Sequence, residues 1–183
     1  MANVNVQSSR RARICQGDVF FEVECIEYVT ERRGIVEVSK IVFPAVLVLT
    51  QDCDLEQDFG NRSKEMRSNT LLSVLVAPLY NAEHVFQGQH LSDMGIKSEQ
   101  INKRKSPGEF LMKNDRPRYH YLDFPAGVPI APAVVDFKHY FSVHVSYLER
   151  IRPKNFVCRL SELFREDVCQ RFSAYLGRIG LPA

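Results

Sequence analysis

The apolar run at residues 45–49, where Ala, Val and Leu follow one another without a polar break, is the clearest strand signal in the chain. A short run of this kind is typical of a strand that is buried on both faces. Residues 50–54, which follow, are abruptly polar and acidic. Functional groups are often placed where a buried strand leaves the core, so we expect Gln51, Asp52, Cys53 and Asp54 to belong to a binding site.

Apolar patterns on both sides of this run predict further strands. Residues 14–28 are rich in Val, Phe and Ile, and Gly17 and Asp18 bend the chain into them. A polar turn at residues 30–34 and a second alternating segment at 35–42 predict a hairpin with a moderately long loop. Residues 70–78 form another buried run that Pro78 ends. A later strand is predicted at residues 117–124, and residues 133–140 and 141–148 predict one or two more.

The clearest helix signal is near the C-terminal end, at residues 160–179. Leu163, Val168, Phe172 and Leu176 belong to an apolar stripe whose members are spaced by three and four positions. Ser161 is suited to cap the start of the helix.

In the other segments the apolar residues do not recur at a regular spacing. Residues 1–12 are polar and then basic, and we expect a disordered tail there. Residues 51–69 predict an exposed loop or a short exposed helix. Residues 81–116 contain Gly, Pro and basic side chains, and we interpret them as an irregular insertion.

Composition places the chain among ordinary globular domains. Its 183 residues are 45% hydrophobic and 25% charged, which fits one domain over residues 13–183. The net charge of +2 excludes a protein coated with basic residues, and no apolar leader or membrane-spanning run is present. The five cysteines show no CxxC spacing, so we expect neither a disulfide framework nor a zinc site. We expect a prokaryotic protein in the cytoplasm, away from membranes.

The order of these segments resembles that of a known family. The matching segments are residues 17–20 (GDVF), 44–50 (PAVLVLT) and 74–78 (VLVAP), followed by later strands and a C-terminal helix. Together they resemble the PemK/MazF-like proteins, in a divergent variant that carries a TQDCDL segment. The resemblance implies a mainly β (α+β) fold: an SH3-like β-barrel with an insertion at residues 81–116 and a C-terminal helix.

Many members of that family are toxin endoribonucleases with an Arg before the Pro of the central strand. They also have a Thr or Ser after the Ala-Pro of the next strand. Phe43 and Tyr80 occupy these positions here. A phenyl ring cannot neutralise the charge that develops on a phosphate during cleavage. An enzymatic alternative would need Arg33 or Lys40 to act with Tyr80.

Three further groups of side chains are considered for chemistry or binding. Cys53 lies between two aspartates, which disfavour a reactive thiolate. The acidic residues at 52, 54, 56 and 58 would share one side of an extended chain, but no glycine follows at an EF-hand position. A basic stretch in residues 97–118 could bind RNA or an acidic partner through Lys103, Arg104, Lys105, Arg116 and Arg118.

We therefore predict a non-catalytic protein-interaction module of a prokaryotic defence or toxin–antitoxin system. The family resemblance supplies that context. A partner protein from the same operon is expected, and RNA binding and a homodimer are alternatives. No metal or cofactor is expected. The alternative function is a divergent, metal-independent endoribonuclease that acts on single-stranded RNA.

Overall fold

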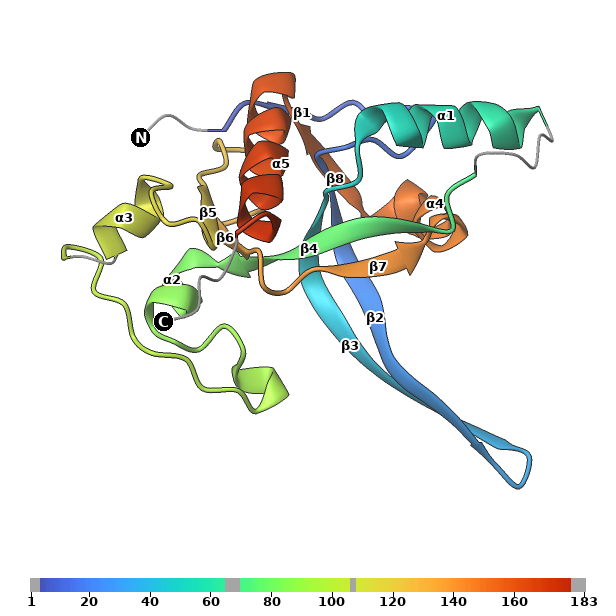
Figure 1. The fold of residues 1–183 in the computed structure, drawn as a ribbon, viewed down its shortest axis with the longest axis horizontal. Coiled ribbons are helices and arrows are strands. Elements are labelled where there is room, and N and C mark those ends of the chain that lie inside the picture. The colour runs from blue at the N-terminus through green and yellow to red at the C-terminus, as the bar shows by residue number, and fades with distance from the viewer. Residues whose placement is uncertain (1–3, 65–69, 106–107, 179–183) are drawn as a thin grey trace.

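The computed structural model describes residues 4–64, 70–105 and 108–178, and Figure 1 shows their arrangement. Its strands are β1 (Val6–Gln7), β2 (Asp18–Arg32), β3 (Ile35–Val48), β4 (Ser73–Asn81), β5 (Tyr119–Leu122), β6 (Ala133–Asp136), β7 (Phe141–His144) and β8 (Phe156–Leu160). Its helices are α1 (Asp52–Ser63), α2 (Ala82–Phe86), α3 (Gly108–Met112), α4 (Val145–Asn155) and α5 (Glu162–Leu176), with a 3₁₀ turn η1 (Ser92–Met94).

The strands form one curled, antiparallel sheet in the order β1-β8-β2-β3-β4-β6-β5. The long strand β4 pairs with β7 along its first half and with β6 at its end, so the sheet divides there. Its curvature gives half of a barrel, with helices packed around it (Figure 1). The fold is mainly β, with helices in an α+β arrangement.

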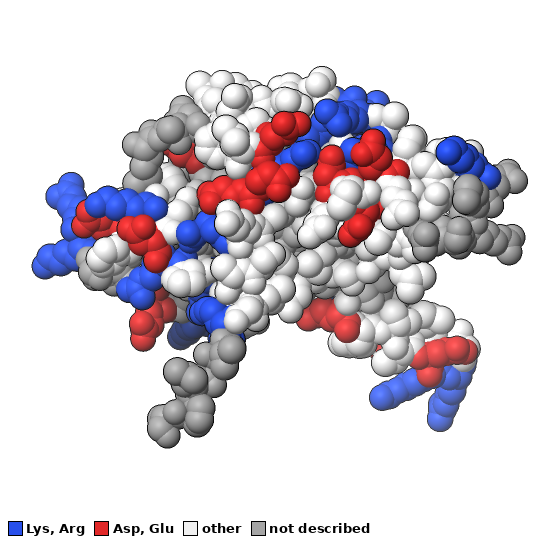
Figure 2. All heavy atoms as spheres, turned by 45° about the horizontal axis from the view of Figure 1, so that its top comes forward, with Lys and Arg blue, Asp and Glu red and all other residues white. Residues whose placement is uncertain are grey.

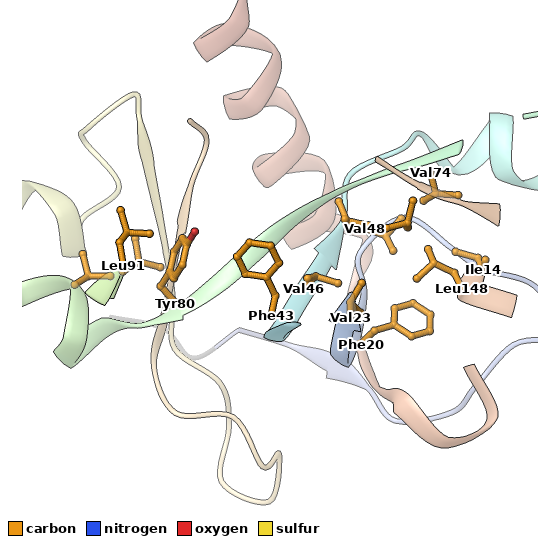
Figure 3. Packing of buried hydrophobic residues seen from close by; sticks show 14 of the residues in the cluster. Ile14, Phe20, Val23, Phe43, Val46, Val48, Val74, Tyr80, Leu91 and Leu148 are labelled. Carbon is orange, nitrogen blue, oxygen red and sulfur yellow. The ribbon is translucent and has the colours of Figure 1, made fainter. Parts of the chain in front are cut away.

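The end of β3 is buried on both faces, as its apolar run predicts. Val46 and Val48 face one hydrophobic cluster, and Figure 3 shows them beside Phe20 and Val23. Leu47 faces a second cluster on the opposite side of the sheet, which α5 covers. Alternate side chains of β3 therefore pack into the two hydrophobic clusters on opposite faces of the sheet.

The β2–β3 hairpin is longer than predicted, and its loop is shorter. Arg33 and Gly34 form the entire turn, with φ angles of 52° and 77°. Positive φ at both central residues defines the type I′ turn, whose twist matches that of the flanking strands. The predicted moderately long loop at residues 30–34 is therefore wrong. The far half of the hairpin, residues 24–42, projects from the body and is called the arm here (Figure 1).

The N-terminal segment is attached to the sheet. Val4 is buried and its backbone N–H donates to the carbonyl of Asp123, at 2.7 Å. Val6 and Gln7 then pair with β8 as strand β1. The prediction of a disordered tail is therefore wrong for these residues, because β8 offers an edge with which the segment can pair.

Several other boundaries differ from the prediction. Of the loop and the short exposed helix predicted within residues 51–69, the helix is present as α1. Residues 145–148, predicted as strand, begin helix α4, where the His144 side chain accepts a hydrogen bond from the Ser146 N–H. Strand β8, which follows α4, was not predicted. The predicted C-terminal helix is present as α5, but its apolar stripe is narrower than expected because Leu163 is 86% exposed.

Candidate functional site: a cleft at the base of the arm

A cleft of about 790 Å³ opens where the arm joins the body. Its walls come from the middle of β3, the end of β4, the loop before β6 and the η1 region of the insertion. Most of the side chains that line it are apolar: Phe21, Ile41, Val42, Phe43, Pro44, Ala45, Leu79, Met94, Pro129, Ile130, Ala131 and Ala133. Volume and lining are typical of sites that bind a ligand or a short segment of a partner.

Phe43 and Tyr80, which the family resemblance aligns with catalytic positions, both line this cleft. They are neighbours in the row of buried side chains shown in Figure 3. Phe43 stacks on Phe141, with ring centroids 5.0 Å apart, and is 8% exposed. The phenyl ring therefore closes the core beside the cleft and brings no charge to it.

The charged groups of the cleft are acidic. Glu22 and Asp93 line it beside the imidazoles of His84 and His90, and its described lining includes neither Lys nor Arg. Glu22 has a φ angle of 53°, which non-glycine residues rarely adopt. Such strain often accompanies binding sites. An acidic, apolar cleft repels phosphate and favours an apolar or cationic ligand.

Tyr80 is held by groups that keep its hydroxyl protonated. Its oxygen lies 3.2 Å from Nδ1 of His139, and its ring contacts His90 edge to face at 5.0 Å. Burial, together with the nearby Asp136 carboxylate, raises the pKa of Tyr80 far above its usual value. The phenol can therefore donate a hydrogen bond but is a poor base at neutral pH.

Asp136 connects this wall to the basic stretch. Its carboxylate accepts two hydrogen bonds from Arg118, at 2.8 and 2.5 Å, and one from the Lys138 N–H. Nδ1 of His139 lies 3.6 Å from the same carboxylate. Burial lowers the pKa of His139 despite the attraction of Asp136, so this imidazole is neutral at pH 7.

His90 separates the cleft from a second cavity of about 480 Å³. Neither of its ring nitrogens has a hydrogen-bond partner among the described residues, although both are buried. Burial lowers the pKa of His90, which keeps the ring uncharged. Arg116, Arg118 and Tyr119 line this second cavity, so the structure brings together two of the predicted basic residues.

The other predicted basic residues are dispersed. Lys103 pairs with Glu83 and lies over the ring of Phe86, while Arg104 and Lys105 are exposed. On the face shown in Figure 2, positive and negative side chains alternate without forming one basic surface. Lys40 pairs with Glu24 on the arm, and Arg33 lies at its tip. The described lining of the cleft therefore includes Tyr80 but neither of these cations.

The acidic segment at residues 51–54 is remote from the cleft lining and contributes to helix packing. Arg13 donates two hydrogen bonds to Asp52, both at 2.9 Å, and Arg165 approaches it at 3.4 Å. Partial burial alone would raise the pKa of Asp52, but these cations and the Gln16 N–H lower it to about 2. Gln51, Cys53 and Asp54 are exposed around this ion pair. The helix places the alternating acidic residues at different angles, so they do not share one side.

Asp136, His90 and His139 are the site residues that sequence reasoning missed. None of the three belongs to a sequence pattern that marks a binding or catalytic site. The hydrogen bond between Tyr80 and His139 joins positions 59 apart in sequence. No local pattern marks such a contact, because it arises from the pairing of β4 with β6.

Comparisons with known proteins give no relative: no family model, no curated protein and no solved structure matches this chain. Within the described ranges, no three His, Cys, Asp or Glu side chains are grouped to hold a metal ion. None of the helices that the structure describes has the length and apolar character needed to cross a membrane.

Proposed function

We propose that this protein is a non-catalytic interaction module whose cleft at the base of the arm holds an apolar segment of a partner protein. The observation that carries the proposal is the lining of the cleft. Apolar side chains of β3, β4 and η1 surround the acidic groups of Glu22 and Asp93, without a Lys or Arg among the described lining residues.

The chemistry of the partner segment follows from this lining. Apolar side chains would be removed from water by Ile41, Phe43 and Met94, which gives most of the binding free energy. A Lys or Arg at its edge would meet Glu22 or Asp93. The resemblance to PemK/MazF-like proteins supports our proposal that the module belongs to a prokaryotic defence or toxin–antitoxin system, with its partner encoded nearby.

Reversing one charge in the cleft tests the proposal. The chain is co-expressed with each protein encoded beside it, and binding of the purified pairs is measured by calorimetry. We expect Asp93→Lys to weaken the complex at least about tenfold, which corresponds to about 1.4 kcal/mol. Glu162→Lys makes the same charge change at an exposed site on α5 and is the matched control. Equal affinities for the two variants, or no neighbouring protein that binds, would contradict the proposal.

RNA cleavage is the second candidate, because three groups capable of proton transfer are clustered at the cleft, two of them in its lining and the third in contact with Tyr80. These are the hydroxyl of Tyr80 and the imidazoles of His90 and His139. Purified protein is incubated with mixed RNA, with and without Mg²⁺, and compared with Tyr80→Phe. We expect intact RNA throughout. Cleavage that disappears in the variant would establish the enzymatic function and refute the non-catalytic one.

A further inference from the structure

The arm exposes more aliphatic surface than a solvated hairpin requires. Among its side chains, Ile26 is 61% exposed, Val29 57%, Val36 59%, Val38 52% and Val42 49%. A two-stranded hairpin is marginally stable by itself, and exposed aliphatic strands tend to associate with other chains. The arm therefore has the character of an interaction surface.

The strand register places these five side chains on one face. Alternate residues of a strand share a face, which groups Val36, Val38 and Val42 with Lys40. Residues paired across the hairpin also share a face. The pairs that make up this face are Glu24 with Val42, Ile26 with Lys40, Val29 with Val38, and Glu31 with Val36. A bulge between Ile26 and Tyr28 brings Val29 onto the same face as Ile26. We call this set the aliphatic face of the arm.

The charges on the aliphatic face alternate in sign along the arm, so that the order read from base to tip is opposite in sign to the order read from tip to base. Proceeding from base to tip, the order is Glu24, Lys40, the uncharged Val29–Val38 pair, Glu31 and the tip residue Arg33. Figure 2 shows acidic and basic side chains together at the end of the projecting arm.

We propose that two copies of this protein form a dimer in which their aliphatic faces pack against each other in antiparallel orientation. A two-fold axis at the Val29–Val38 pair places valines on valines. It also places Lys40 of one copy at the level of Glu31 of the other, and Glu24 at the level of Arg33. In a parallel arrangement each residue would instead lie at the level of the same residue in the other copy. Charges of the same sign would then lie at the same level. The charge order therefore selects a second copy as the occupant.

The expected affinity is modest. The contact involves one face of a short hairpin and is smaller than the ~800 Å² per partner of a standard interface. We expect a dissociation constant on the order of 10 μM to 100 μM, and an affinity that depends on salt. The aliphatic face shares Val42 with the lining of the cleft, but positions 31, 38 and 40 do not line it. Variants at those three positions therefore test the dimer separately from the proposed function.

The oligomeric state of the full chain tests the proposal by sedimentation velocity over a wide concentration range. We expect a monomer–dimer equilibrium for the native protein. Val38→Lys should weaken it by at least about tenfold, since it buries a charge at the centre of the contact. Leu72→Lys is the matched control, because Leu72 is 83% exposed outside the arm. A native protein that remains monomeric well above 100 μM would refute the dimer.

A charge exchange separates this geometry from other modes of association. Glu31→Lys and Lys40→Glu should each dissociate their own homodimer, because equal charges then face each other at both ends of the contact. Mixing the two variants restores opposite charges at both ends, so we expect a heterodimer with near-native affinity. If mixing restores nothing, or if either variant dimerises like the native protein, the antiparallel arrangement is wrong.

Discussion

Gly17 shows how one residue without a side chain connects three parts of the fold. It has a φ angle of 79°, donates to the carbonyl of Val48 and accepts from the N–H of Leu160. A Cβ atom at this position would lie 2.9 Å from Cβ of Arg165 and 3.3 Å from Cβ of Leu160. The turn into β2, the strand β8 and the helix α5 can therefore approach only because glycine is present.

Gly17→Ala should consequently destabilise the protein by about 2–4 kcal/mol, from backbone strain and the forced separation of α5. Urea unfolding followed by circular dichroism measures the change. Gly60→Ala is the control, since Gly60 lies inside α1 with no atom within 4 Å of its added Cβ. That variant should gain about 0.5–1 kcal/mol. Similar effects in both variants would show that close packing at Gly17 is unimportant.

The positions of some residues could be predicted from the sequence, whereas the contacts of others could not. The Gly17–Asp18 bend could be predicted, because these residue types favour turns. The resemblance to a family drew attention to Phe43 and Tyr80, but their common position in the cleft lining is seen only in the structure. The partners of Asp52 could not be predicted, because Arg13 and Arg165 lie far from it in sequence and meet it only after folding.

Helix α1 depends on this ion pair for its attachment. Leu55 and Asp58 are the buried residues of the helix, so apolar contact alone fixes it weakly. Asp52, in its first turn, binds Arg13 of the N-terminal segment and approaches Arg165 of α5. A carboxylate at a helix N-terminus also interacts favourably with the helix dipole. One side chain therefore joins three elements.

Asp52→Asn should cost about 2 kcal/mol in the free energy of unfolding, because it leaves the buried guanidinium of Arg13 without this anion. Asp54→Asn removes an exposed carboxylate from the same helical turn and should cost about 0.5 kcal/mol. A double-mutant cycle with Arg13→Gln isolates the pair. A coupling energy near zero would mean that the pair contributes nothing to stability.

The molecule as a whole should lose stability in acid, because its core contains a neutral histidine. His120 is 1% exposed, and burial, with the nearby Arg171, lowers its pKa to about 3. Its contribution is present above the unfolded pKa of about 6.5 and is lost as the pH falls toward 3. Burial raises the pKa of Asp18 to about 6 despite the contact with Arg159, and this opposes the loss between pH 6 and 3.8.

We therefore expect the free energy of unfolding to fall between pH 7 and pH 4, with the histidine effect exceeding that of Asp18. His120→Gln should reduce the slope in this range, whatever its effect on stability at pH 7. His84→Gln changes an exposed histidine and serves as the control. Urea unfolding at a series of pH values measures both slopes. An unchanged slope for His120→Gln would show that His120 does not control the acid response.

The sequence by itself determined the buried end of β3, the position of α5 and the mainly β character of the fold. These depend on local apolar patterns, which follow from the geometry of one strand or one helix. It left a loop and a short exposed helix as alternatives for α1, and it missed β8, whose five residues give too little pattern to distinguish a strand from a loop.

Tertiary structure alone decided what surrounds the cleft and which way the arm projects. The end of β4 meets β6 and the insertion only when the sheet curls, and this brings Tyr80, His139 and Asp136 together. The arm continues past the body because the register of β2 and β3 extends to the turn at Arg33 and Gly34. Such features depend on contacts between distant segments, whose free energy no local pattern records.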